Sequence, residues 1–446
     1  GFSMVSVWQS HLDPADTTRI DISPASMGNI SLDSLPATFA DYDQFYNFFE
    51  GGDTGKGYAV NPKTGQPYQQ QMVRRGDYGR ILAEFWADGP DSETPPGHWF
   101  VILNYVMDQP GFQRRFAGSG QPLPPLEWDV KAYFTLGGAM HDAAVAAWSV
   151  KGFYDYIRPV SAIRYMATQG QSSNPAQPRY SPKGMPLVNG YIELVKAGDP
   201  LAGANGEHLN KIKLYTWRGH DFVQNTETDH AGVGWILAEN WWPYQRPSFV
   251  TPPFAGYVSG HSTFSRAAAE VLTLVTGDPY FPGGAGEFVA TKNEYLVFEE
   301  GPSETVVLQW AKYYDASDQC SLSRIWGGIH PPADDLPGRK MGSAIGKKAF
   351  AFASQLFSLP PLALLPTAAA AQLLYPNPAT TTVFLTANKQ QAQQLRLFHL
   401  NGTAVPANRY AVSKAGELWQ VDVARLVPGL YLLTTGKGHW YRIIKK

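Results

Sequence analysis

The sequence predicts a mainly α-helical protein: a helical bundle followed by a small all-β sandwich. Through residues 1–357, apolar residues recur with helical spacing and strand-like alternation is scarce. Near residue 358 the composition changes, and short runs of β-branched and aromatic residues follow, separated by turn dipeptides. The 44% hydrophobic and 13% aromatic content is that of a globular protein. We therefore expect a helical domain over residues 1–357, a linker over 358–372 and a β-sandwich over 373–446.

Stretches rich in Ala, Leu and aromatic residues define the expected helices, and Gly, Pro and Asp clusters such as Asp88-Gly89-Pro90 end them. Residues 1–75 are rich in Gly, Pro, Asp and Thr and are expected to be mostly irregular, with one or two helices. The expected helices are Tyr78–Trp86, Trp99–Met107, Trp128–Tyr154, Tyr191–Ala197, Glu207–Thr216, Ser262–Thr276, Glu304–Tyr314 and Gly342–Leu356.

The C-terminal segment differs in kind from the rest of the chain. Prolines and an alanine run between Ser358 and Ala371 are typical of a linker. Turn dipeptides at Asn401-Gly402 and Pro428-Gly429 separate short β-type runs. The runs are Val383–Leu385, Leu395–Phe398, Trp419–Val421 and Leu430–Leu433.

Charge and hydropathy exclude several classes of protein. The formal net charge is −2, so the chain lacks the basic excess of a general nucleic-acid binder, and an anion site would have to use a few local cations. The single cysteine, Cys320, cannot form an intrachain disulfide. No apolar run reaches the roughly 18 residues of a membrane-spanning helix, so we expect no transmembrane segment.

The first motif with chemical potential is Lys151 to Arg158-Pro159. Lys151 and Arg158 are seven residues apart, so on a continuing helix both would face one way. Two cations on one face repel each other unless an anion or carboxylates neutralise them. The alternative is a solvated pair on a surface helix.

The second motif is Ser259-Gly260-His261, before an alanine-rich helix. Small residues at a helix start leave N–H groups pointing at a ligand, and the helix dipole favours negative charge there. His261 beside a bound oxyanion could give or take a proton. The alternative is an ordinary serine N-cap followed by an exposed histidine.

The third motif runs from Ser323-Arg324 through Gly327-Gly328 to His330 and Asp334. The glycines should interrupt any helix, and a new helix should start after His330. Asp334 lies one turn further, where its carboxylate can accept the Nδ1–H of His330 and leave Nε2 free. Arg324 offers a planar fork that suits a tetrahedral oxyanion. The alternative is a histidine capping its own helix, with Asp334 at the surface.

Taken together, the order and spacing of these motifs resemble the signature of the superfamily shared by vanadium-dependent haloperoxidases and type 2 phosphatidic acid phosphatase (PAP2) enzymes. Val258 stands where proline is usual, at a position that supplies no catalytic group. The flanking segments Glu84–Pro90, Pro95–Trp99 and Phe249–Phe254 are also similar to bacterial members of this superfamily. The resemblance covers most of residues 78–350.

The resemblance implies a role for each matching residue. His330 would be bonded to the vanadium of vanadate, or would be the nucleophile in a phosphatase. His261 would be the acid–base partner, and Asp334 would orient His330. The vanadate or phosphate oxygens would be bound by Lys151, Arg158, Ser259, the Gly260 amide and Arg324.

The implied activity is vanadium-dependent oxidation of halide by hydrogen peroxide, with a small organic acceptor as a further candidate partner. The alternative is a soluble PAP2-like acid phosphatase that hydrolyses phosphate monoesters through a phosphohistidine, because phosphate can occupy the same site. An inert scaffold and a phosphate-binding protein without turnover are the non-catalytic alternatives. The size of the helical segment and the absence of a membrane bundle favour the haloperoxidase.

Three supporting residues also come from the resemblance. Trp148 and Phe254 stand where chloroperoxidase-type members carry aromatic residues, although both could be ordinary core side chains. Asp88 corresponds to a family aspartate that pairs with the first arginine, here Arg158.

The tail resembles the C-terminal sorting domain of type IX secretion. The matching pieces are Tyr375–Pro378, Leu400–Gly402, Pro428–Tyr431 and the basic end Arg442–Lys446. This implies recognition by the type IX machinery and a secreted or outer cell-surface location. The alternative is a generic β-sandwich appendage.

Overall fold

The computed structural model describes residues 1–89, 93–358, 374–399, 402–436 and 440–446. The chain divides into two compact units, Gly1–Phe357 and Ser358–Lys446, and each is described here by itself. The expected linker lies outside the described residues from residue 359 on, as do Pro90, Leu400 and Asn401.

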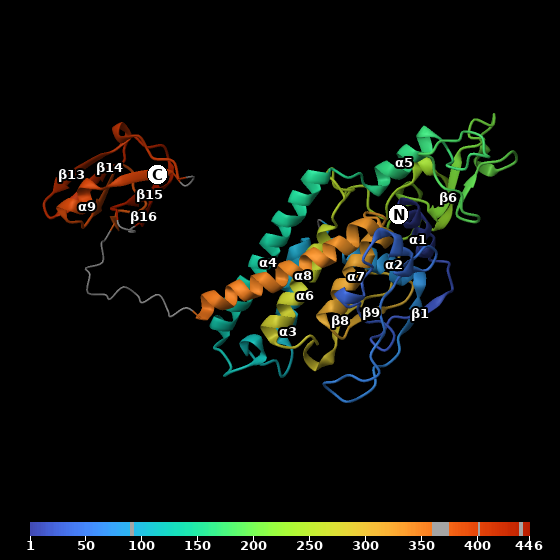
Figure 1. Ribbon diagram of the computed structural model, residues 1–446, viewed down its shortest axis with the longest axis horizontal. Coiled ribbons are helices and arrows are strands. Elements are labelled where there is room, and N and C mark those ends of the chain that lie inside the picture. The colour runs from blue at the N-terminus through green and yellow to red at the C-terminus, as the bar shows by residue number, and fades with distance from the viewer. Residues whose placement is uncertain (90–92, 359–373, 400–401, 437–439) are drawn as a thin grey trace. The chain divides into compact units, whose positions relative to one another are not determined.

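The first unit is mainly helical, as the sequence predicts (Figure 1). Its α-helices are α1 (Phe2–Trp8), α2 (Arg75–Phe85), α3 (Pro95–Asp108), α4 (Pro125–Tyr154), α5 (Pro159–Gln169), α6 (Gly260–Thr276), α7 (Tyr313–Trp326) and α8 (Pro332–Ser358). The last residue of α8, Ser358, is the first residue of the second unit. Its strands are β1 (Arg19–Asp21), β2 (Tyr46–Asn47), β3 (Gly51–Gly52), β4 (Met72–Arg74), β5 (Ile192–Leu194), β6 (Ile212–Trp217), β7 (Val233–Leu237), β8 (Gly286–Ala290) and β9 (Val306–Trp310).

Helix α6 lies inside the bundle, packed against α3, α4 and α7. Its small residues Ala267, Ala268 and Ala269 are completely buried and let the neighbouring helices approach closely. Helix α8 also comes close: a Cβ added to Gly342 would lie 2.3 Å from the carbonyl oxygen of Thr263. This packing holds the N-terminal ends of α6 and α8 side by side, and both ends carry predicted site residues.

Three of the expected helices are wrong. Residues 191–197 contain β5, residues 207–216 run into β6, and residues 304–314 contain β9. In β6 and β9 buried and partly exposed residues alternate, and Val, Ile, Trp and Tyr favour such a half-buried strand. Strands β5, β6 and β7 form one antiparallel sheet, and β8 pairs with β9. The remaining expected helices correspond to α2, α3, α4, α6 and α8, while α5 and α7 were not expected.

The second unit consists of two small antiparallel sheets. Their order is β10-β11-β14-β13 and β12-β15-β16, and one apolar core that includes Val383, Leu397 and Ile443 is shared by both. Its elements are β10 (Leu374–Tyr375), β11 (Thr382–Leu385), α9 (Lys389–Gln393), β12 (Arg396–His399), β13 (Ala411–Ala415), β14 (Leu418–Asp422), β15 (Gly429–Thr434) and β16 (Trp440–Lys445). The four expected strand runs correspond to β11, β12, β14 and β15.

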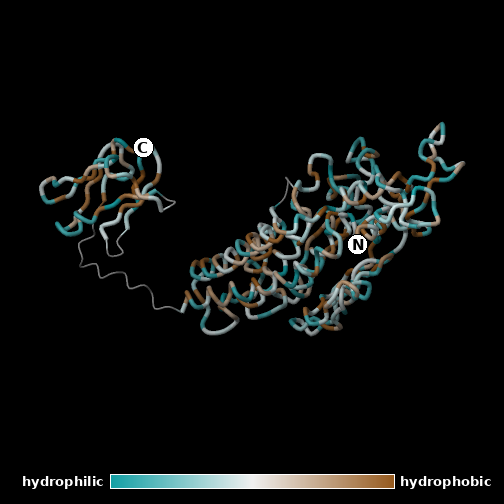
Figure 2. The backbone as a smooth tube through the Cα atoms, turned by 45° about the horizontal axis from the view of Figure 1, so that its top comes forward, coloured by the Kyte–Doolittle hydropathy of each residue, from teal (hydrophilic) through white to brown (hydrophobic). Residues whose placement is uncertain are grey.

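Hydropathy follows these elements. Figure 2 shows hydrophilic segments at the tips of several loops and mixed hydropathy along the helices, as expected for helices with one buried face. Within the described ranges, no helix combines the length and apolar character needed to cross a membrane.

Candidate oxyanion site

Most of the predicted site residues come from the ends of five helices of the first unit, α4 to α8. Lys151 is in the last turn of α4, Ser259 precedes α6, Arg324 is near the end of α7, and Asp334 is in the first turn of α8. Helix α4 ends at Tyr154, Asp155 adopts a left-handed conformation, and Arg158 caps the start of α5. The expectation that Lys151 and Arg158 lie on one continuing helix is therefore wrong: a turn between two helices brings them together.

Lys151 is buried and its ammonium is bonded to backbone carbonyls. Nζ donates to the carbonyl oxygens of Ala255 and Gly256 at 3.0 and 2.7 Å. An ammonium has three hydrogens, so these two bonds leave one for a ligand. Burial, followed by the charge of Arg158, lowers the pKa of Lys151 to about 7. The low pKa shows that the protein solvates this cation poorly.

Arg158 connects the α4–α5 turn with His330. Its Nε donates to the carbonyl oxygen of Phe254 at 2.9 Å, and Nη1 lies 3.2 Å from Nε2 of His330. Because a guanidinium can only donate, Nε2 of His330 must be the unprotonated nitrogen in this arrangement. Burial lowers the pKa of Arg158 to about 10, and nearby Arg324 acts in the same direction.

His330 and Asp334 form the pair that the third motif predicts. Nδ1 of His330 lies 2.6 Å from Oδ2 of Asp334, and both side chains are almost completely buried. Burial, together with Arg158 and Lys151, holds the pKa of His330 well below its ordinary value, so the ring is neutral. Its single proton is then on Nδ1, toward Asp334, and the lone pair of Nε2 is available to a ligand. Burial raises the pKa of Asp334 to about 7, while Lys151 and Arg158 oppose that rise.

Arg324 is the third cation of the cluster. It is 3% exposed, and its Nη1 donates to the carbonyl oxygen of Trp86 at 2.8 Å. Within the part of the chain that the structure describes, its buried Nε has no hydrogen-bond partner. The charge of Arg324 contributes to lowering the pKa values of Arg158, His261 and His330, which places it electrostatically among them.

Ser259 and Gly260 form the start of α6. Ser259 is the N-cap: its Oγ accepts from the Ser262 amide at 3.2 Å, and its own amide donates to the carbonyl oxygen of Asp334 at 2.9 Å. The capping role that the sequence left as an alternative is therefore present. The hydroxyl hydrogen remains a donor, so capping and anion binding are compatible. A Cβ added to Gly260 would lie 3.3 Å from the ring of Trp148, so a side chain there would require that ring to shift by a few tenths of an ångström.

His261 bonds to Asp88 through Nε2, at 3.0 Å from Oδ2. The other oxygen of Asp88 lies 3.0 Å from Nδ1 of His98. The expectation that Asp88 pairs with Arg158 is thus corrected, because its carboxylate bonds two imidazoles instead. Burial alone would raise the pKa of Asp88, but the bonds to His261 and His98 hold it below its usual value. Burial and then Arg324 lower the pKa of His261 to about 4.

Trp148 and Phe254 lie beside the cations as an aromatic wall. Their ring centroids are 5.5 Å apart, and Nζ of Lys151 lies 5.8 and 5.7 Å from the two rings. The two residues are 45% and 42% exposed, so they are not ordinary core residues. They form an apolar border between the cluster and the surface.

The sequence analysis missed a second group of buried charges next to the site. Asp335, one residue after Asp334, accepts from Ser262 and from both Nε and Nη2 of Arg339. Arg339 and Arg266 both pair with Asp318, on α7. The spacing Asp335–Arg339 is the usual i, i+4 ion-pair spacing, which was the available signal. His98 was also missed as a partner of the site, because only the fold brings it to Asp88.

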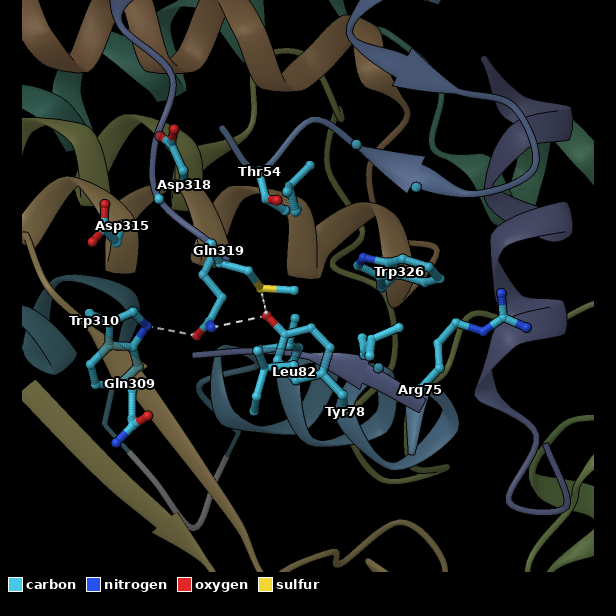
Figure 3. Close-up of a pocket in the computed structure, with 18 of the residues that line it drawn as sticks. Thr54, Arg75, Tyr78, Leu82, Gln309, Trp310, Asp315, Asp318, Gln319 and Trp326 are labelled. Atoms are coloured by element: carbon cyan, nitrogen blue, oxygen red, sulfur yellow. Dashed lines mark hydrogen bonds between the residues drawn. The ribbon is translucent and has the colours of Figure 1, made fainter. Parts of the chain in front are cut away.

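A cavity of about 220 Å³ lies on the other side of α7, between α2, β1 and β9. Figure 3 shows Gln319 joined to Trp310 and Tyr78. The side-chain oxygen of Gln319 accepts from Nε1 of Trp310 and also from Nε1 of Trp86, at 3.1 Å. These polar groups bond to one another and so stabilise Trp86, whose carbonyl oxygen accepts from Arg324. We therefore assign no reaction to this cavity.

The geometry defines a helical-bundle protein with a buried, cationic site that contains an imidazole lone pair. The family model of the VCPO second helical-bundle domain matches residues 131–359, just over half of the chain, and the chain belongs to that family. Residues 373–446 match the model of the secretion system C-terminal sorting domain, so the second unit is a sorting domain of this kind. No curated protein matches the chain.

Three solved structures are similar in part. A bacterial vanadium-dependent chloroperoxidase is 17% identical in its apo form (TM-score 0.42, covering 63% of this chain and 45% of that one). In its holo form it is 18% identical (TM-score 0.42, covering 63% and 44%). A bacterial vanadium-dependent iodoperoxidase is 20% identical (TM-score 0.33, covering 62% and 43%). This chain thus spans less than half the length of each.

Proposed function

We propose that the protein is a vanadium-dependent haloperoxidase that oxidises halide with hydrogen peroxide. The supporting observation is the combination of three buried cations, Lys151, Arg158 and Arg324, with the unprotonated Nε2 of His330. Their hydrogen bonds in the structure go to carbonyl oxygens and to His330 rather than to carboxylates. A tetrahedral oxyanion supplies the missing negative charge and acceptors for the unpartnered Nε of Arg324.

The residues therefore fit vanadate. Lys151, Arg158 and Arg324 would hold its oxygens, Ser259 and the Gly260 amide would donate to it, and His330 would bind vanadium through Nε2. When bound, vanadate supplies electrophilic activation of peroxide toward halide. The overall reaction, halide plus peroxide plus a proton giving hypohalous acid and water, consumes one proton.

His261 is the residue we assign to move that proton. In the neutral ring, the bond from Nε2–H to Asp88 leaves Nδ1 as the nitrogen that exchanges a proton at the site. The negative charge of a bound oxyanion raises the low pKa of His261 and makes it a better proton carrier when the site is filled. Asp334 fixes the tautomer of His330 and keeps its lone pair exposed to the ligand.

The same residues could act as a soluble phosphomonoesterase, with His330 as nucleophile. The aromatic wall of Trp148 and Phe254 favours the peroxidase, because an apolar wall limits the access of water to an oxidising centre. For the sorting domain we propose export by type IX secretion, which places the enzyme at the cell surface or outside.

A paired assay on one preparation tests this proposal. The protein is incubated with orthovanadate, freed of excess, and assayed for bromide- and chloride-dependent halogenation of a dye with hydrogen peroxide. The vanadate-free protein is assayed in parallel with p-nitrophenyl phosphate. Vanadate-dependent halogenation is the expected result, whereas ester hydrolysis without halogenation would move the protein to the phosphatase branch.

A further inference from the structure

Asp88 links the oxyanion site to a histidine outside it. His98, in the first turn of α3, lies 3.0 Å from Oδ1 of Asp88 through Nδ1, while His261 lies 3.0 Å from Oδ2. The Asp88 side chain is only 1% exposed. A buried carboxylate is an acceptor, so Nδ1 of a neutral His98 carries its proton and Nε2 is left as a hydrogen-bond acceptor.

The His98 ring packs against two aromatic side chains and borders a cavity. Its centroid is 4.6 Å from that of Phe85, edge to face, and 4.6 Å from that of Trp86, stacked. The side chain is 7% exposed, and no group in the described part of the chain is hydrogen-bonded to Nε2. Nε2 is therefore left as an acceptor that a ligand in the neighbouring cavity can use.

The cavity beside His98 is large and aromatic. It has a volume of about 340 Å³ and is lined by residues of α2, α3 and the β8–β9 hairpin. Figure 1 labels these elements. Its walls include Phe85, Tyr105, Phe288 and Trp310, and Trp310 also borders the cavity of Figure 3. An apolar cavity of about 150 Å³ is enough to bind benzene, so one substituted ring fits easily.

The polar groups of the cavity exclude anions. Glu93 and Glu287 contribute carboxylates to its lining, burial raises the pKa of the lining residue Glu84 to about 8, and His98 presents an acceptor. Halide and oxyanions are repelled by such a surface, whereas an aromatic ring that carries an O–H or N–H group matches it: the ring packs on the walls and the group donates to Nε2.

We propose that this cavity is a binding site for phenols and neutral aromatic amines, recognised by Nε2 of His98. Its use as the site of the organic acceptor rests on the proposed haloperoxidase function. Electron-rich rings of this class react with hypohalous acid: a ring C–H bond is replaced by a carbon–halogen bond, and the proton leaves with hydroxide as water. A ligand at His98 is two hydrogen bonds from His261, through Asp88.

The first test measures binding to the vanadate-free full-length protein by calorimetry, with phenol, aniline and toluene as ligands of similar shape. Phenol and aniline should bind about three- to tenfold more tightly than toluene, the effect of one neutral hydrogen bond. Equal affinity of phenol and toluene, or no binding of any of them, would overturn the proposal.

Variants identify the site. His98→Phe should remove the preference for phenol over toluene, and Val101→Trp, at an exposed position of the lining, should weaken all three ligands. His141→Phe, at a histidine 76% exposed on α4, is the matched control and should change nothing. If His98→Phe still prefers phenol over toluene, the ligand binds elsewhere. If His98→Phe does not fold, the affinities of Val101→Trp show whether the ligand binds in this cavity.

A second readout separates this proposal from the proposed function. With vanadate-loaded enzyme, halogenation rates should saturate with phenol concentration in the wild type and rise linearly in Val101→Trp. Phenol binding without any halogenation would reject the haloperoxidase and leave the site standing. Halogenation of the dye without phenol binding would reject the phenol site and leave the haloperoxidase standing.

Discussion

Two clusters of buried charge lie at the junction of α6, α7 and α8, and they are neutralised in opposite ways. The ion-pair cluster joins Arg266 and Arg339 to Asp318 and Asp335 at 2.8 to 3.2 Å. The oxyanion cluster, Lys151, Arg158, Arg324 and His330, has carbonyl oxygens and an imidazole as partners. The two share consecutive residues of α8, because Asp335 belongs to the first and Asp334 orients His330 in the second.

The difference separates a structural from a functional use of buried cations. Carboxylates raise the pKa of Arg339 above its ordinary value despite burial, whereas burial lowers the pKa of Arg158 to about 10 and that of Lys151 to about 7. The first cluster is complete without a ligand. The cations of the second have no carboxylate as a hydrogen-bond partner among the described residues, which is the property that we expect of the proposed anion-binding site.

The largest effect should come from breaking the complete cluster. Arg339→Met leaves Asp318 and Asp335 buried without this cation, and we expect the free energy of unfolding to fall by about 3–5 kcal/mol in urea titrations. Lys340→Met, at the exposed neighbouring position, is the control. A loss for Arg339→Met no greater than the control would mean that this network contributes little.

Removal of the proposed vanadium ligand comes next. His330→Ala should lower vanadate affinity by more than about 100-fold in equilibrium dialysis, because substitutions that only disturb the partners of a metal ligand already cost 10- to 100-fold. The melting temperature should stay close to that of the wild type. Equal vanadate affinity in the two proteins would remove His330 from the site.

Lys151→Met should behave in the opposite way to Arg339→Met. It relieves the repulsion with Arg158 and the burial of an ammonium, so stability in urea should be unchanged or higher. Sulfate affinity, measured by calorimetry, should fall by about tenfold to 100-fold, the effect of losing a charge-assisted bond. Loss of stability with unchanged sulfate affinity would make Lys151 a structural cation.

Sulfate binding should also depend on pH. Lys151 has a pKa of about 7 in the free protein, and a bound dianion raises it, so binding takes up a proton above pH 7. Affinity should therefore fall by up to about tenfold per pH unit above that value. Asp334, with a pKa raised to about 7, acts in the same sense because its ionised form repels the anion. The slope should be shallower in Lys151→Gln, and a flat wild-type profile would contradict the assignment.

The smallest effect concerns the aromatic wall. Phe254→His introduces a polar ring beside Lys151 and Trp148 and should lower chloride turnover relative to bromide turnover by a few-fold, on the order of 1 kcal/mol. Phe153→His, at an 82% exposed ring of α4, is the control. A chloride-to-bromide ratio equal to that of the wild type would leave the wall without a role in halide choice.

The sequence predicted the helical class, the tail and the local His330–Asp334 pair, because one-turn spacing fixes that contact. It did not predict α7, which is buried around polar residues such as Asp315 and Asp318, whose partners are brought to them only by the fold. It also overlooked the alternation in β6 and β9, which resembled apolar helical segments.

Long-range contacts were the other feature that the sequence could not predict. The partners of Asp88 come from α3 and from α6, 10 and 173 residues away, and no local pattern distinguishes an imidazole from an arginine as partner. The turn that ends α4 at Asp155 depends on a left-handed residue that is not glycine, so the spacing of Lys151 and Arg158 suggested one helix where there are two.

A crystal structure of the protein loaded with vanadate tests the central claim most directly. We predict density for an oxyanion joined to Nε2 of His330, within hydrogen-bond distance of Lys151, Arg158 and Arg324, with the bond between Arg158 and His330 replaced by contacts to the anion. Vanadate bound elsewhere, or a cation cluster that stays empty at saturating vanadate, would contradict the account.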